Sequence, residues 1–148
     1  MKKIVITGGI GYIGTEICKI YSGESWNNQI TVIDNRFISE RVSQLRKWNM
    51  NFVHADIRKI DEVKKYLNEA DIVHHLAGVT DVPRTELELN EEKDKELRDI
   101  AEKGTEVVLS ETSQNCKIIF PSTHVVFEGK KDLIKDIRED FEKLPILP

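Results

Sequence analysis

The first residues whose spacing points to chemistry are four glycines near the start of the chain, at positions 8, 9, 11 and 14. They follow the short apolar run Lys3–Thr7 and precede residues with helical spacing. Gly9, Gly11 and Gly14 fit the pattern G-x-G-x-x-G, and Gly8, Gly11 and Gly14 fit G-x-x-G-x-x-G. In either register we expect a tight turn whose backbone N–H groups approach a pyrophosphate at the N-terminus of a helix. A phosphate-binding P-loop needs a lysine after its last glycine, and none follows here, so that alternative is excluded.

A carboxylate stands at the distance that a dinucleotide-binding unit requires. Asp34 ends a second apolar run, Ile30–Asp34, and comes 20 residues after Gly14. A carboxylate at this place accepts hydrogen bonds from the hydroxyls of the adenosine ribose and repels a 2′-phosphate. The pattern therefore predicts NAD rather than NADP, with Arg36 close enough to offset part of this preference. The alternative for Asp34 is a solvated residue at the end of a strand.

Apolar runs and segments of helical spacing alternate along the rest of the chain. This alternation predicts an α/β fold of the Rossmann type, a doubly wound parallel sheet in three layers (α/β/α). We expect five strands, at Lys3–Thr7, Ile30–Asp34, Asn51–Asp56, Asp71–Gly78 and Lys117–Ser122. We expect four helices, over Gly11–Ser22, around Ile38, Val42 and Leu45, around Ile60, Val63 and Leu67, and over Glu86–Ser113. Residues 1–129 would form the dinucleotide-binding domain, and 130–148 a tail leading to a catalytic and substrate-binding region missing from the chain.

The composition excludes several classes of protein. The chain has 148 residues and a net charge of −4, whereas nucleic-acid binders usually carry a basic surface. It has no run of about 18 apolar residues, so no membrane span is expected. Cys18 and Cys116 lie far apart, outside any metal-binding motif, which indicates reduced thiols in a cytoplasmic protein. No metal site is expected, because the adjacent His74 and His75 would point to opposite faces of a strand.

Five stretches together resemble the extended short-chain dehydrogenase/reductase family, and specifically its NAD-dependent sugar-nucleotide epimerases and dehydratases. They are TGGIGYIG (7–14), VIDN (32–35), HADIR (54–58), VHHLAG (73–78) and FPSTHVVF (120–127), so the resemblance covers nearly the whole chain. In this family Asp56 would hold the adenine amine, with Ile57 beside the ring. The residues implied to bind the cofactor are Gly8, Gly11, Tyr12, Ile13, Gly14, Asp34, Asn35, Asp56, Ile57, Leu76, Ala77, Gly78 and Ser122.

The resemblance also implies a reaction and partners. A tyrosinate whose pKa is lowered by a lysine removes a proton from a sugar hydroxyl, and NAD accepts the hydride from that carbon. A Ser or Thr hydroxyl bonds the reacting oxygen, and aligning Val126–Phe127 with the family's Val-Tyr places it at Thr123. The substrate would be a nucleotide sugar. The helix over Glu86–Ser113 corresponds to one that forms a homodimer through a four-helix bundle.

The chain departs from the family at the catalytic base. The family has Tyr-x-x-x-Lys, whereas the residues four positions after Tyr12, Tyr21 and Tyr66 are Glu, Ser and Ala. The chain reaches Pro148 about where the catalytic tyrosine would be expected. Ala101 also stands where the family often has an asparagine that supports this tyrosine. Two functions stay open: the cofactor-binding part of an epimerase or dehydratase, and a stand-alone NAD(H)-binding module without catalysis.

Overall fold

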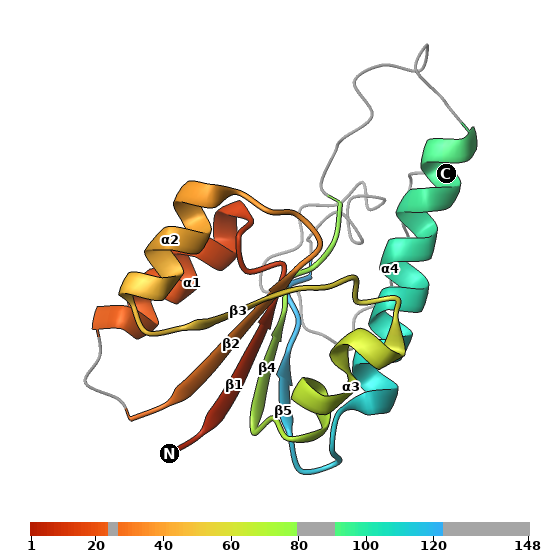
Figure 1. The fold of residues 1–148 in the computed structure, drawn as a ribbon. Coiled ribbons are helices and arrows are strands. Elements are labelled where there is room, and N and C mark those ends of the chain that lie inside the picture. Colours follow the sequence, from red (N-terminus) through yellow and green to blue (C-terminus); the bar gives the residue numbers. More distant parts are fainter. Residues whose placement is uncertain (24–26, 80–90, 123–148) are drawn as a thin grey trace, which may run out of the picture.

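Parallel strands and helices alternate through the whole described part of the chain. The computed structural model describes residues 1–23, 27–79 and 91–122 (Figure 1). Within these ranges the order of elements is β1 (Lys3–Thr7), α1 (Tyr12–Gly23), β2 (Gln29–Asp34), α2 (Ser39–Lys47), β3 (Asn51–His54), α3 (Ile60–Asn68), β4 (Ile72–His75), α4 (Glu91–Glu111) and β5 (Lys117–Ile119).

The strands form one sheet in the order β3-β2-β1-β4-β5, with every neighbouring pair parallel. The predicted Rossmann-type fold is therefore confirmed. The inner strands β1 and β2 are mainly apolar because both faces of a parallel sheet are covered by helices. From Ile4 to Thr7, for example, every residue of β1 is buried.

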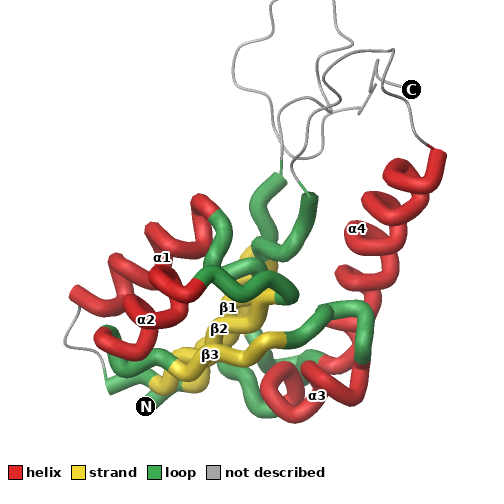
Figure 2. The backbone as a smooth tube through the Cα atoms, turned by 45° about the horizontal axis from the view of Figure 1, so that its top comes forward, coloured by secondary structure: helices red, strands yellow, loops and turns green. Residues whose placement is uncertain are grey.

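Helices cover the two faces in pairs. Figure 2 shows α1 and α2 on one side of the sheet and α3 and α4 on the other. Two separate apolar clusters fill the space between the layers. Cys18 of α1 and Leu45 of α2 belong to the first cluster, and Val63 of α3 and Val108 of α4 belong to the second. Each face of the sheet thus has its own core.

The strand order reverses between β1 and β4. The chain leaves β1 toward α1 on one face, while β4 leads toward α4 on the other face. Thr7 pairs with Ile33 of β2 and with His75 of β4, so these three strands end at the same edge. Loops that diverge from such a point leave a crevice at the carboxyl ends of the strands, where α/β proteins bind ligands.

Some strands are shorter than predicted at that edge. β4 ends at His75 and β5 at Ile119, each three residues earlier than expected, and β3 ends two residues early. β4 stops because its neighbour β1 stops: Gly8 has a φ of 68° and turns the chain away. β5 ends before Pro121, which has no N–H to donate to a ladder. Several expected cofactor-binding residues therefore lie in loops rather than in strands.

The helices lie close to their predicted places. α4 ends at Glu111, two residues before the predicted Ser113, and the predicted residues 86–90 lie outside the described part of the chain. Among the described residues of this helix, Gly104, Val107 and Val108 are buried. A Cβ atom at Gly104 would overlap the side chain of Ile57. The glycine therefore lets α4 approach the loop that follows β3.

Candidate functional site

The glycine-rich loop begins with a turn against the end of β4. Gly8 is the first residue after β1, and a Cβ atom there would lie 2.7 Å from the backbone of Leu76 and Ala77. Its positive φ is one that side-chain-bearing residues rarely adopt. The amide of Gly11 donates to the carbonyl of Gly8 at 3.0 Å and closes the turn. Gly8 thus allows both the turn and the close approach to β4.

The remaining glycines let α1 pack directly on the turn. A Cβ atom at Gly14 would lie 2.5 Å from the carbonyl oxygen of Gly8 and 2.6 Å from the Cα of Gly9. A Cβ atom at Gly9 would overlap the side chain of Val32 in β2. The two registers considered for the motif therefore describe one structure. Gly8 makes the turn, and Gly9 and Gly14 provide the close packing.

The loop is held from both sides at Ile10. The side chain of Ile10 is fully buried. The backbone amide of Ile10 donates to Oδ2 of Asp34 at 3.3 Å, and its backbone carbonyl accepts from Arg41 of α2. α1 begins two residues later, so the N–H groups of Tyr12 and Ile13 have no partner earlier in the helix. Both side chains are exposed, at 86% and 54%. The fixed loop therefore presents free donors and the positive end of the helix dipole at the crevice.

Asp34 is a buried carboxylate that joins β2 to the glycine loop. Its side chain is 3% exposed. Besides the Ile10 amide, it accepts from the amide of Arg36 at 3.0 Å and from Nε of Arg36 at 3.3 Å. The alternative of a solvated strand end is therefore wrong for Asp34. The exposed polar group at this place is the Arg36 guanidinium, whose side chain is 57% exposed and whose Nη2 lies 3.6 Å from where a Cβ of Gly11 would be.

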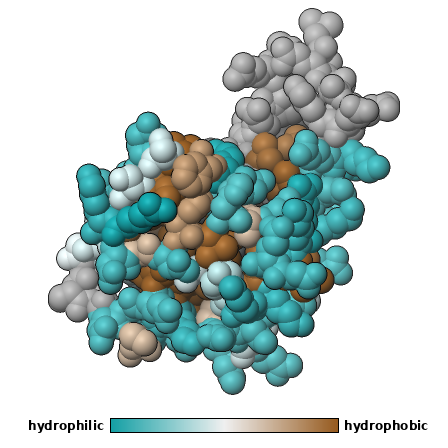
Figure 3. Space-filling model, in the orientation of Figure 1, coloured by the Kyte–Doolittle hydropathy of each residue, from teal (hydrophilic) through white to brown (hydrophobic). Residues whose placement is uncertain are grey.

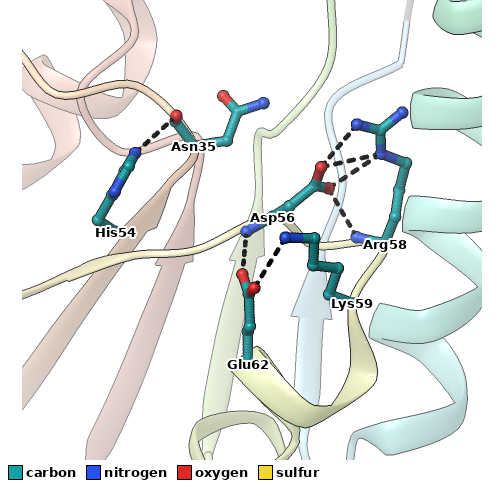
Figure 4. Close-up of polar contacts among 6 residues, drawn as sticks. All are labelled: Asn35, His54, Asp56, Arg58, Lys59 and Glu62. Atoms are coloured by element: carbon teal, nitrogen blue, oxygen red, sulfur yellow. Dashed lines mark hydrogen bonds and ion pairs between the residues drawn. The ribbon is translucent and has the colours of Figure 1, made fainter.

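Asp56 follows β3 at the same edge of the sheet. Its carboxylate accepts from the amide, Nε and Nη2 of Arg58, the last at 2.6 Å (Figure 4). These hydrogen bonds with Arg58 hold the pKa of Asp56 below its usual range. The amide of Asp56 donates to Glu62, which also bonds Lys59. The carboxylate expected to hold an adenine amine is thus oriented by an arginine two residues away.

A histidine holds the loop between β2 and α2. Nε2 of His54 lies 2.9 Å from the carbonyl oxygen of Asn35 (Figure 4). Because a carbonyl can only accept, Nε2 carries the proton. The ring of Phe37 packs edge-on against His54 and against Phe52, with ring centroids 6.5 and 6.0 Å apart. Asn35, an expected cofactor ligand, is therefore exposed on a loop fixed by its neighbours.

The remaining expected site residues are divided among three environments. Leu76 and Ala77 are half-buried beside Gly8, and Gly78 is exposed. Ile57 is buried in the core against Gly104, so its side chain points to α4. Ser122 is exposed after β5, and Thr123, the expected catalytic hydroxyl, lies outside the described residues.

The two adjacent histidines of β4 face opposite sides of the sheet, as predicted. Nε2 of His74 meets the hydroxyl of Tyr21 on α1 at 2.9 Å, whereas Nε2 of His75 meets Thr105 on α4 at 3.0 Å. Within the described ranges no three His, Cys, Asp or Glu side chains gather as a metal site would require. Cys18 and Cys116 are free, and burial raises the pKa of Cys18 to about 12.

These histidines predict a pH dependence of stability. Burial lowers the pKa of both His74 and His75 below the usual value of about 6.5. Below about pH 6.5 the unfolded chain therefore binds more protons than the folded chain. The free energy of unfolding should consequently fall as the pH is lowered from 7 to 5. Denaturant titrations at several pH values measure this slope. The variant His75→Asn should have a shallower slope, and a flat profile in the parent chain would contradict the prediction.

Several residues that shape the site had no signal in the sequence motifs. Arg41, Thr7 and Thr105 come from three different elements and meet the loop or β4 only after folding. A hydroxyl at the end of the apolar run Lys3–Thr7 was the one available hint, because a buried threonine needs a partner. Polar side chains on helices carry no such hint, since most of them face solvent.

Large apolar side chains are exposed near the crevice. Tyr12, Phe37, Val79 and Phe120 are 49–86% exposed and follow or adjoin the carboxyl ends of strands. In Figure 3, apolar residues gather in the middle of the view, while the side formed by α4 is hydrophilic. No helix in the described ranges is long and apolar enough to cross a membrane. Exposed apolar groups at such a crevice suit a ligand with aromatic rings.

Known proteins with the same fold were found by sequence and by structure. A UDP-glucose 4-epimerase of Mycoplasma genitalium is 32% identical over 83 residues, 54% of this chain and 24% of the relative. Human short-chain dehydrogenase/reductase family 42E member 1 is 29% identical over an alignment covering 99% of this chain and 35% of that protein. A UDP-glucose 4-epimerase of Stenotrophomonas maltophila, solved with NAD and formylated UDP-arabinopyranose, has a TM-score of 0.74 at 20% identity, covering 97% of this chain and 43% of that one. The enzyme of Bifidobacterium longum, solved with NAD+ and UDP, has a TM-score of 0.72 at 25% identity, covering 95% and 42%.

The chain spans about a quarter to a third of the length of these curated relatives. A model of the 3-beta hydroxysteroid dehydrogenase/isomerase family matches residues 5–146. This match runs from β1 through every element that forms the crevice. The chain therefore belongs to the 3-beta hydroxysteroid dehydrogenase/isomerase family, one of the extended short-chain dehydrogenases/reductases.

Proposed function

We propose that this chain holds NAD as the cofactor-binding part of a sugar-nucleotide epimerase or dehydratase. One observation carries the proposal: a turn that only glycines fit leads into the N-terminus of α1, beside the buried carboxylate of Asp34. The donors of α1 suit a pyrophosphate, and Asp34 lies where an adenosine ribose would be held. Bound NAD would supply a hydride acceptor, and the protein would supply position and electrostatics.

The preference for NAD over NADP rests on Asp34. Its negative charge opposes a 2′-phosphate, and the Arg36 guanidinium offsets part of that charge. Similar structures in the family contain NAD. A nucleotide sugar is proposed as the substrate because these two structures are UDP-glucose 4-epimerases, one solved with formylated UDP-arabinopyranose and the other with UDP. Thr123 would bond the reacting oxygen of the sugar.

A stand-alone NAD(H)-binding module is the second candidate. It is favoured because no tyrosine of this chain is followed four residues later by lysine. Tyr21, moreover, is engaged with His74 beneath α1, away from the crevice. In this role the chain would bind dinucleotides and catalyse nothing alone.

Calorimetric titration of the purified chain with NAD and NADP tests the proposal. We expect both to bind at one site, with NAD the tighter ligand. Binding of neither would contradict the assignment of the crevice. Incubation with NAD and UDP-glucose is a second test, because formation of UDP-galactose by this chain would exclude the non-catalytic module.

The proposal includes self-association through α4. Leu109 on this helix is 55% exposed, and a partner helix would cover it. Sedimentation velocity at increasing concentration should show a monomer–dimer equilibrium, and the variant Leu109→Glu should shift it toward monomer. A parent chain that stays monomeric at every concentration would contradict a dimer.

A further inference from the structure

A buried histidine connects the floor of the crevice to α4. His75 is 1% exposed, and its two ring nitrogens have different partners. Nδ1 lies 2.8 Å from the hydroxyl of Thr7 at the end of β1, and Nε2 lies 3.0 Å from the hydroxyl of Thr105 in α4. The ring also packs against Phe120 after β5, with centroids 5.4 Å apart. One side chain therefore contacts β1, α4 and the residue that follows β5.

The hydrogen bonds of Thr7 determine which nitrogen carries the proton. The amide of Ala77 donates to Oγ1 of Thr7 at 3.3 Å. Among the described residues, the other polar partner of this hydroxyl is Nδ1 of His75. Oγ1 could accept from both groups, but its own buried proton would then have no acceptor among the described residues. Buried polar groups are normally paired, so we infer that Thr7 donates to Nδ1 and that Nδ1 is unprotonated. His75 is then neutral, with its proton on Nε2, from which it donates to Thr105.

The Ala77 amide at the end of this chain of hydrogen bonds lies against the glycine turn. The nitrogen of Ala77 is one of the backbone atoms 2.7 Å from where a Cβ of Gly8 would lie. The neighbouring amide, of Leu76, donates to the carbonyl of Thr7 at 3.1 Å. The backbone after β4 is thus tied to Thr7 and pressed against the glycine turn. A shift of Ala77 would move the surface on which the turn rests.

We propose that His75 is a positioning residue, which holds the Ala77 amide against the glycine turn through Thr7. Both of its ring nitrogens are engaged, with Thr7 and Thr105, so it would act on the turn through Thr7. The hydrogen bond from Thr7 to Nδ1 orders the dinucleotide crevice, and the hydrogen bond from Nε2 to Thr105 connects the sheet to α4. The consequence for NAD affinity rests on the proposed function, whereas the hydrogen-bond chain itself does not.

Two substitutions of His75 test the hydrogen bonds of its two ring nitrogens separately. The amide of asparagine reaches about as far as Nδ1, so His75→Asn can keep the bond to Thr7. The longer glutamine places its amide near Nε2, so His75→Gln can keep only the bond to Thr105. Thr7→Val removes the hydroxyl beside Ala77, and Thr105→Val is its matched control at the other end.

Hydrogen exchange of the Ala77 amide in the free protein is the first measurement. We expect exchange to become at least tenfold faster in His75→Gln and Thr7→Val, and to stay within about twofold in His75→Asn and Thr105→Val. Nitrogen chemical shifts of the parent ring should show Nδ1 unprotonated and Nε2 protonated. Equal exchange in His75→Asn and His75→Gln, or the opposite tautomer, would overturn the proposal.

The Kd for NAD is the second measurement. It should rise about tenfold in His75→Gln and Thr7→Val but less than about threefold in the other two variants. A parent chain with the expected tautomer and Ala77 protection that binds no NAD would refute the proposed function alone. A parent chain that binds NAD, with Ala77 exchange unchanged in Thr7→Val, would refute the role of His75 alone.

Discussion

Replacing Gly14 with alanine should abolish measurable NAD binding and lower the free energy of unfolding by about 2–3 kcal/mol. The added methyl group would lie 2.5 Å from the Gly8 carbonyl oxygen and 2.6 Å from the Cα of Gly9. Both are backbone atoms, so no side-chain rotation can relieve the overlap. α1 must move away from the turn, and the amides at its N-terminus move with it. Urea denaturation and calorimetric titration measure the two effects.

Gly23 provides the matched control for this substitution. It ends the same helix, its φ lies outside the left-handed region, and no atom lies within 4 Å of where its Cβ would be. Gly23→Ala should therefore leave NAD affinity unchanged and stability the same or slightly higher. If Gly14→Ala behaved like Gly23→Ala, the close packing of α1 on the turn would not be needed for binding.

The strands could be predicted because each is an apolar run that a two-sided parallel sheet requires. Their ends could not, because Leu76 and Ala77 are as apolar as the strand before them. The end of β4 is decided by Gly8, nearly 70 residues earlier, where the backbone of β1 turns away. The residues of β4 alone do not indicate where the neighbouring strand ends.

The candidate site likewise has features that the sequence predicts and features that it does not. The spacing of Gly14 and Asp34 is a property of one β-α-β unit, so the sequence alone predicts that they share an edge of the sheet. The hydrogen bonds of Ile10 are different: its amide donates to Asp34 and its carbonyl accepts from Arg41 of α2. They form only when the loop and α2 have packed together. The contact of His75 with Thr105 spans 30 residues and two layers. Such contacts follow from tertiary packing, which no local pattern encodes.

The choice between NAD and NADP is expected to change most when Asp34 is replaced by alanine. In the parent chain, this carboxylate accepts from Ile10 and Arg36 while almost fully buried. Its loss leaves the Ile10 amide without its acceptor, removes the proposed partner of the adenosine ribose, and frees the Arg36 guanidinium. NAD affinity should fall about tenfold to a hundredfold, since hydrogen bonds to charged groups are worth about 1.5–3 kcal/mol.

NADP should lose much less affinity in the same variant, because the freed guanidinium can pair with the 2′-phosphate. The ratio of the two dissociation constants, measured by calorimetry, should therefore move toward NADP. Arg36→Ala is the matched control: it leaves the Asp34 charge without its ion pair, so discrimination against NADP should increase. The double variant Asp34→Ala/Arg36→Ala should lose this shift of the ratio toward NADP. The carboxylate repels a 2′-phosphate and the guanidinium attracts it, so removing the carboxylate must change the ratio if these two groups discriminate. The same ratio in the parent chain and in Asp34→Ala would therefore show that another group discriminates between the dinucleotides.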